Sequence, residues 1–232
     1  MGTASYTVIK TRNLPQPGGD WTLPEWKEAH TLSVASFHPQ SSNHHPQVTC
    51  KVLYDDAKLY WSFFVRDRYV LAEKLEYQSQ VCEDSCVEFF IHPAGASGYF
   101  GFETNCIGTM LLKYIEDPTR TPTGFVKATR VPEADVTGVM VWHSISERPY
   151  LPENPEPLEW RVDVSVPFDL FGKYIPNFTP PISTPRAPGT LWKGNFFKCA
   201  DKSSHPHWAS WAPTGEALNF HVPRYFGELR FG

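Results

Sequence analysis

Apolar and polar residues alternate most regularly in the stretch from Cys82 to Leu112, CEDSCVEFFIHPAGASGYFGFETNCIGTMLL. A period of two residues places successive side chains on opposite faces of a strand. The pattern therefore predicts one strand over 87–92, a turn at PAGASG, a second strand beginning at Tyr99 and a third at Met110.

Three polar side chains rise from this otherwise aromatic sheet, and they are Glu88, Glu103 and Asn105. Two interpretations follow from the pattern. The sheet face could simply be solvated, or the three groups could form a concave polar platform that receives a ligand.

Similar strand patterns recur along the chain with turn residues between them. They lie at 6–10, 48–54, 59–66, 127–132, 139–146, 158–166, 192–199 and 225–231. The segments between them include a loop with a helical turn over 67–81, a single helical turn over 167–172 and proline-rich loops at 147–159 and 173–189. About ten strands with almost no helix predict a two-sheet antiparallel β-sandwich.

We expect residues 1–232 to form one domain in which residues 1–46 are a first strand and an arm. Trp21 and Trp26 are expected to pack this arm against the body.

Composition excludes several classes of protein. The net charge of −4 and the absence of any basic run argue against nucleic-acid binding. No apolar stretch is long enough to span a membrane as a helix. The N-terminus lacks an apolar signal core, and a secreted protein without its leader would look the same. We expect an extracellular or periplasmic protein whose signal peptide is absent here, with a cytoplasmic location left open.

The five cysteines show no CxxC spacing and no recognisable zinc-ligand set. Cys86 and Cys106 fall in predicted strands, where free cysteine behaves as a small buried apolar residue. A disulfide between Cys82 and Cys199 stays open at this point.

The loop over 201–223 is crowded with aromatic and histidine side chains, which are His205, His207, Trp208, Trp211, Phe220 and His221. Exposed indoles suit sugars, because the apolar C–H face of a pyranose stacks on an aromatic ring while its hydroxyls need polar partners. The alternative is that Trp208 and Trp211 plug the end of the sandwich.

The order of these motifs resembles the family 9 carbohydrate-binding modules, within the DOMON-like group of β-sandwiches. The matching segments are DDAKLYWSFFVRD, EDSCVEFFIHP, YFGFETNCIGT, EWRVDVSVPFDLFG, WKGNFFKCAD, HWASWAP and FGELRF. Together they span Val48 to Phe231. The resemblance implies a sandwich that binds sugars, with a preference for chain ends, between two clamping tryptophans.

Carried onto this chain, the resemblance implies that Trp208 or Trp211 is one clamping residue and that Glu88 is the acidic partner. Where the family has a tryptophan just before Asp84, this chain offers Tyr77 as a weaker platform. A fused or associated glycoside hydrolase in polysaccharide utilisation is a further implication.

Some members of the family also hold calcium at loop carboxylates. The candidates here are Asp55, Asp56, Asp84 and Asp201, although no dense acidic loop is present.

We therefore expect a non-catalytic carbohydrate-binding protein. Its expected ligand-binding residues are Trp208, Trp211, Glu88, Glu103, Asn105, Tyr77, Arg66 and His207.

Three alternatives stay open. Glu88 and Glu103 could be the paired carboxylates of a glycosidase. A metal enzyme would use His205, His207 and His221. A haem-binding domain would draw on Met110, Met140 and His143.

Overall fold

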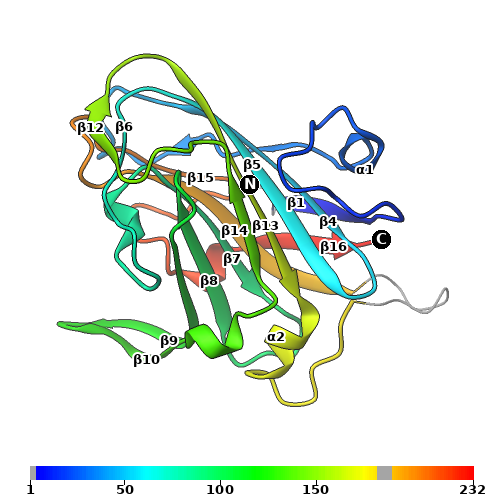
Figure 1. Cartoon of the computed structure of the whole chain (residues 1–232). Coiled ribbons are helices and arrows are strands. Elements are labelled where there is room, and N and C mark those ends of the chain that lie inside the picture. Colours follow the sequence, from blue (N-terminus) through cyan, green and yellow to red (C-terminus); the bar gives the residue numbers. More distant parts are fainter. Residues whose placement is uncertain (1–3, 182–189) are drawn as a thin grey trace.

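The structure is a computed structural model that describes residues 4–181 and 190–232, and it is a β-sandwich (Figure 1). Sheet A contains β7 (Cys86–His92), β8 (Tyr99–Asn105), β9 (Met110–Thr121), β10 (Gly124–Arg130), β14 (Leu191–Cys199) and β16 (Gly227–Phe231). β15 (Trp208–Ser210) pairs with β14, and β3 (Ser36–Phe37) pairs with β15. Sheet B contains β4 (Gln47–Tyr54), β5 (Lys58–Asp67), β13 (Leu158–Pro167) and β11 (Met140–His143), with β2 (Leu32–Ser33) beside β4.

Strand β1 (Ser5–Lys10) belongs to both sheets. It runs parallel to β16 over its first residues and parallel to β4 at Ile9 and Lys10. All other pairings in the described residues are antiparallel. The predicted two-sheet sandwich is confirmed, and β1 is the exception to its antiparallel order.

Aromatic side chains from the two sheets meet in the core. The Trp61 ring of β5 lies edge-on to Phe89 of β7, with ring centroids 5.3 Å apart, and to Phe102 of β8 at 5.1 Å. These residues hold the core-facing positions of the alternating pattern. The hairpin of β9 and β10 extends beyond this body (Figure 1).

The N-terminal arm packs on the outer face of sheet B. It carries α1 (Pro24–Lys27), whose Trp26 is buried against Leu53 and Tyr60. Trp21 is half-buried, and its indole nitrogen donates a hydrogen bond to the Ser62 hydroxyl over 2.8 Å.

Two segments that were expected to be irregular contain strands. The stretch 67–81 includes β6 (Val70–Ala72), and the proline-rich stretch 147–159 includes β12 (Tyr150–Asn154). Among the strands of the described residues these two pair only with each other, so the signal for each lies in a distant segment and not in its own sequence. Of the predicted loop at 173–189, residues 182–189 lie outside the described residues.

The remaining helical elements are single turns. They are α2 (Phe168–Gly172), which confirms the predicted helical turn, and the 3-10 turns η1 (Val81–Glu83), η2 (Glu133–Asp135) and η3 (Pro223–Tyr225).

A buried polar cluster joins the two sheets near one end of the core. The Lys198 ammonium lies 3.3 Å from Asp67 and 2.7 Å from the His207 Nε2 atom, and all three side chains are buried. His44 completes the cluster with a 2.7 Å contact to Asp67. Burial alone would raise the pKa of Asp67, but Lys198 and His44 outweigh it and lower that pKa.

Replacing one member of this cluster should destabilise the fold strongly. In Asp67→Asn the Lys198 ammonium stays buried without its counter-charge, which costs about 3–5 kcal/mol in buried ion pairs. We expect a loss of that size in the free energy of unfolding, measured by urea denaturation. Asp56→Asn, which removes the exposed partner of Lys10, is the matched control and should change stability little. A loss of stability in Asp67→Asn no larger than in the control would show that the buried cluster does not stabilise the fold.

Candidate functional site

A cavity of about 270 Å³ opens on the outer face of sheet A, away from the core. Strands β7, β8, β9 and β14 form its floor, and the chain around residues 218–221 forms a wall. Its lining residues are Gln80, Cys82, Glu88, Glu103, Lys113, Arg120, Cys199, Asp201, Trp208, Leu218, Asn219, Phe220 and His221.

Two carboxylates lie side by side in the floor of this cavity. Glu88 of β7 is directly opposite Glu103 of β8 in the antiparallel register, and they are only 3% and 4% exposed. Burial raises the pKa of both groups. The neighbouring Glu103 charge raises the pKa of Glu88 further, whereas Lys113 and Arg120 oppose the rise for Glu103.

The hydrogen bonding of the two carboxylates differs. Glu88 accepts a hydrogen bond from the Cys199 thiol over 3.2 Å. Glu103 accepts none from any residue in the described part of the chain. A buried carboxylate needs donors to offset its lost hydration, so Glu103 is prepared to accept them from a ligand.

Two cations reach the cavity from β9. The Arg120 guanidinium lies 4.4 Å from the centre of the Phe125 ring of β10, and the Lys113 ammonium lies 5.6 Å from the same ring. His221 belongs to the cavity wall formed by residues 218–221, and its Nδ1 atom lies 2.8 Å from the Tyr99 hydroxyl. Burial and the two cations lower the pKa of His221 well below its usual value, so the ring is neutral at physiological pH.

Two aromatic side chains also line the cavity. Trp208 is half-buried, and its indole nitrogen donates to Asp201 over 2.7 Å, which fixes the ring at the rim. Phe220 stacks on Phe197 with ring centroids 4.2 Å apart. An indole face, two carboxylates and two cations therefore surround one cavity.

Of the expected site residues, Trp208, Glu88 and Glu103 share the cavity, and so does Asp201, which the resemblance offered as a calcium ligand. Trp211 does not line it. Its ring packs on the core residue Phe196, with centroids 5.6 Å apart, and fills the space that a side chain at Gly227 would need.

Three further expected residues also lie outside the cavity lining. The Tyr77 hydroxyl donates to the Val131 carbonyl over 2.9 Å, and the ring packs on the core. Arg66 is on sheet B, where its guanidinium pairs with Glu159. His207 is a buried partner of Lys198, as described above.

Asn105 holds the turn between β8 and β9. Its amide donates to Asp84 over 2.8 Å and to the Lys74 carbonyl over 2.9 Å, and its carbonyl accepts the Thr109 amide. Every polar atom of this buried side chain is used within the protein, so Asn105 positions the turn and does not face the cavity.

The Asn105 geometry predicts a stability effect. Asn105→Ala removes one of the donors to Asp84 and leaves the Thr109 amide without its acceptor, which costs roughly 1–3 kcal/mol. We expect that loss in the free energy of unfolding by denaturant titration. Asn13→Ala is the control, because Asn13 is exposed in the arm. Equal stability of the two variants would show that the Asn105 network does not hold the turn.

The predicted calcium ligands do not converge on one site. Asp84 accepts the backbone amides of Glu73 and Lys74, each over 3.0 Å, and Asp55 caps its own turn by accepting the Ala57 and Lys58 amides. Asp201 is bound to the Trp208 indole. These carboxylates therefore do not fit a calcium ion.

The histidine and haem sets do not converge either. His221 lies in the cavity wall, whereas His207 belongs to the core cluster. Met110 is buried in the core, and Met140 is exposed on sheet B.

All five cysteines are free thiols. Among the described residues, a different set brings three metal-binding atoms together: Cys86, Glu88 and Cys199.

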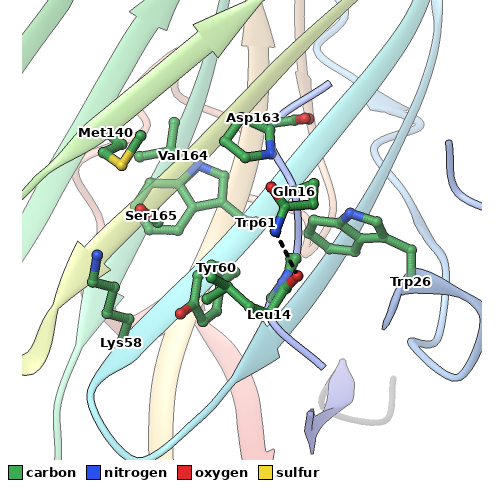
Figure 2. A pocket seen from close by; sticks show the side chains of 12 residues that line it. Leu14, Gln16, Trp26, Lys58, Tyr60, Trp61, Met140, Asp163, Val164 and Ser165 are labelled. Carbon is green, nitrogen blue, oxygen red and sulfur yellow. Dashed lines mark hydrogen bonds between the residues drawn. The ribbon is translucent and has the colours of Figure 1, made fainter. Parts of the chain in front are cut away.

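A second groove lies on the outer face of sheet B, beneath the N-terminal arm (Figure 2). Figure 2 shows Met140, Ser165 and Lys58 along one side, with Leu14 and Trp26 on the other. Its cavity measures about 170 Å³, and its lining is mainly apolar. The two tryptophans in it, Trp26 and Trp61, are buried, so this groove presents no open indole face to a ligand.

Several cavity residues were not predicted from the sequence. Lys113 carried a usable signal, because alternation along the strand from Leu111 places it on the same face as Glu103. Arg120 and Asn219 carried none, because their approach to the cavity depends on the path of the β9–β10 hairpin and of the last long loop.

The fold and the cavity together define a β-sandwich binding domain. The family model for carbohydrate-binding family 9 matches residues 24–231. The chain belongs to this family.

Solved structures support the assignment. A Bacteroides uniformis protein assigned to carbohydrate binding superposes with a TM-score of 0.81 at 26% identity, and the alignment covers 100% of both chains. A family 9 carbohydrate-binding module from Caldicellulosiruptor kristjanssonii, solved with glucose, superposes with a TM-score of 0.59 at 15% identity over 99% of this chain and 96% of that one. A family 9 carbohydrate-binding module from the same organism, solved with cellotriose, gives a TM-score of 0.59 at 15% identity over 98% of this chain and 93% of that one.

No curated protein matches the chain. Within the described residues, no helix has the length and apolar character needed to cross a membrane.

Proposed function

We propose that the cavity on sheet A binds the terminal ring of an oligosaccharide or polysaccharide without cleaving it. The observation that carries this proposal is Glu103, a buried carboxylate that faces the cavity, beside the half-exposed indole of Trp208. A sugar hydroxyl would supply the hydrogen bond that Glu103 does not receive from the described residues.

The two sides of the cavity match the two characters of a sugar ring. Trp208 offers an apolar face for the C–H side of a pyranose, and Phe220 adds a second ring at the wall. Glu103 accepts hydrogen bonds from sugar hydroxyls, while Lys113, Arg120 and Asn219 donate hydrogen bonds to sugar oxygens. Phe220 therefore takes the role of second aromatic platform that was expected of Tyr77 or Trp211.

The size of the cavity favours a chain end. Small-molecule sites enclose roughly 300–1,000 Å³, and this cavity of about 270 Å³ is at the lower limit. One ring fits such a space better than the middle of a long chain. The glucose and cellotriose held by the related module make these two sugars the first probes.

Calorimetry with glucose and cellotriose tests the proposal. We expect dissociation constants between about micromolar and millimolar for the wild type. Trp208→Ala should weaken binding roughly threefold to tenfold or more, because stacking contributes about 0.5–1.5 kcal/mol beyond buried area. Glu103→Gln should weaken it by tenfold or more, because a hydrogen bond to a charged group contributes roughly 1.5–3 kcal/mol.

Trp142→Ala is the matched control for the indole. Trp142 is half-buried on β11, in sheet B, and does not line the cavity. It should leave sugar affinity unchanged. Unchanged affinity in Trp208→Ala and Glu103→Gln, with binding present in the wild type, would reject this cavity as the site.

The paired carboxylates favour one second candidate, a glycoside hydrolase that uses Glu88 and Glu103. Their raised pKa values are a property that a general acid needs. Release of reducing sugar from cellotriose by the wild type, lost in both Glu88→Gln and Glu103→Gln, would establish that candidate in place of simple binding.

The biological setting that we propose follows from the ligand. A module that holds polysaccharide ends acts outside the cell or in the periplasm, alongside a fused or associated glycoside hydrolase.

A further inference from the structure

A thiol–carboxylate cluster lies in the floor of the cavity, and sugar binding makes no use of its thiols. Cys86 of β7 is directly opposite Cys199 of β14 in the antiparallel register, and Glu88 follows on the same face of β7. One ligand atom from each of the three lies within 4.8 Å of the other two. All three side chains are buried, at 0%, 1% and 3% exposure for Cys86, Cys199 and Glu88.

We propose that Cys86, Cys199 and Glu88 bind a thiophilic divalent cation of the zinc class. Zinc binds thiolate sulfur at about 2.3 Å and carboxylate oxygen at about 2.0–2.2 Å in a tetrahedral arrangement, so its ligand atoms lie roughly 3.3–3.8 Å apart. The 3.2 Å separation between the Cys199 sulfur and the Glu88 Oε1 atom is already close to that spacing. Small side-chain adjustments complete the set.

The ligand types select the metal. Thiolates favour zinc and other soft or borderline ions, whereas calcium and magnesium require oxygen ligands throughout. Two sulfurs and one carboxylate therefore exclude calcium at this cluster and fit zinc. Both thiols release their protons to solvent when the metal binds.

The cluster is also accessible. Cys199 and Glu88 line the cavity, so an ion can enter and its fourth coordination position faces the open space. Glu103 and Asp201 add carboxylates to the same lining, and Lys113 and Arg120 add two cations. The Glu88 carboxylate has only the Cys199 thiol as a hydrogen-bond donor among the described residues, and a cation would replace that weak partner.

This inference is independent of the sugar proposal, because it rests on the two thiols and Glu88 while the sugar contacts are assigned to Trp208 and Glu103. Metal binding can be measured without sugar, and the reverse also holds. Failure of one proposal leaves the other standing.

Cobalt(II) substitution in the reduced protein provides the test. The wild type should bind one Co²⁺ with the intense thiolate-to-cobalt absorption and the visible bands of a tetrahedral site, and Zn²⁺ should displace it. Cys86→Ser and Cys199→Ser should abolish the thiolate absorption, and Glu88→Gln should weaken binding by tenfold or more. Cys50→Ser is the matched control, because Cys50 is an equally buried thiol on β4, outside this cluster.

X-ray absorption at the zinc edge of the wild-type protein covers the case in which a serine variant does not fold. Two sulfur ligands with one or two oxygen ligands support the site. A coordination shell without sulfur, an absence of Co²⁺ absorption in the folded reduced wild type, or equal loss in Cys50→Ser and Cys199→Ser would overturn the proposal.

Discussion

The strict alternation of side chains along β7 and β14 is the constraint on which both the core and the cavity depend. Phe89 and Phe196 face the core and stack with ring centroids 4.1 Å apart. Their neighbours Glu88 and Phe197 face the cavity side. A slip of one residue in this pairing would turn core-facing rings toward the cavity side or Glu88 toward the core, so core packing fixes the register that builds the site.

Buried polar groups in this protein fall into two kinds. The first kind is complete within the protein, as for Asn105 and for Asp67 with its partners Lys198 and His44. These groups hold strands and turns together. The second kind is incomplete, as for Glu103, and faces a cavity. Counting hydrogen bonds separates the two kinds where burial and charge alone do not, because both kinds are equally hidden from solvent.

The sequence predicted the strands that carry their own alternating pattern, including the pairs around Glu88 and Glu103. It did not predict β6 and β12, because their pairing joins segments about 80 residues apart. The site was predicted in part for the same reason. Trp208 and Trp211 are three residues apart in one loop, and only the fold shows that the first borders the cavity while the second packs on Phe196. Spacing along a loop carries no information about direction.

The cysteines show the reverse case, in which residues far apart in the sequence come together in the fold. They have no metal-binding spacing along the chain, yet Cys86 and Cys199, which are 113 positions apart, are cross-strand partners in sheet A. Motif spacing detects ligands that share a turn or a helix, whereas a β-sheet assembles ligands from different strands across its register. In an antiparallel sheet, a pair of cysteines opposite each other with a carboxylate two residues along one strand is the pattern to look for. It becomes recognisable only once the strand pairing is known, which is why the thiols of this chain looked unconnected in the sequence.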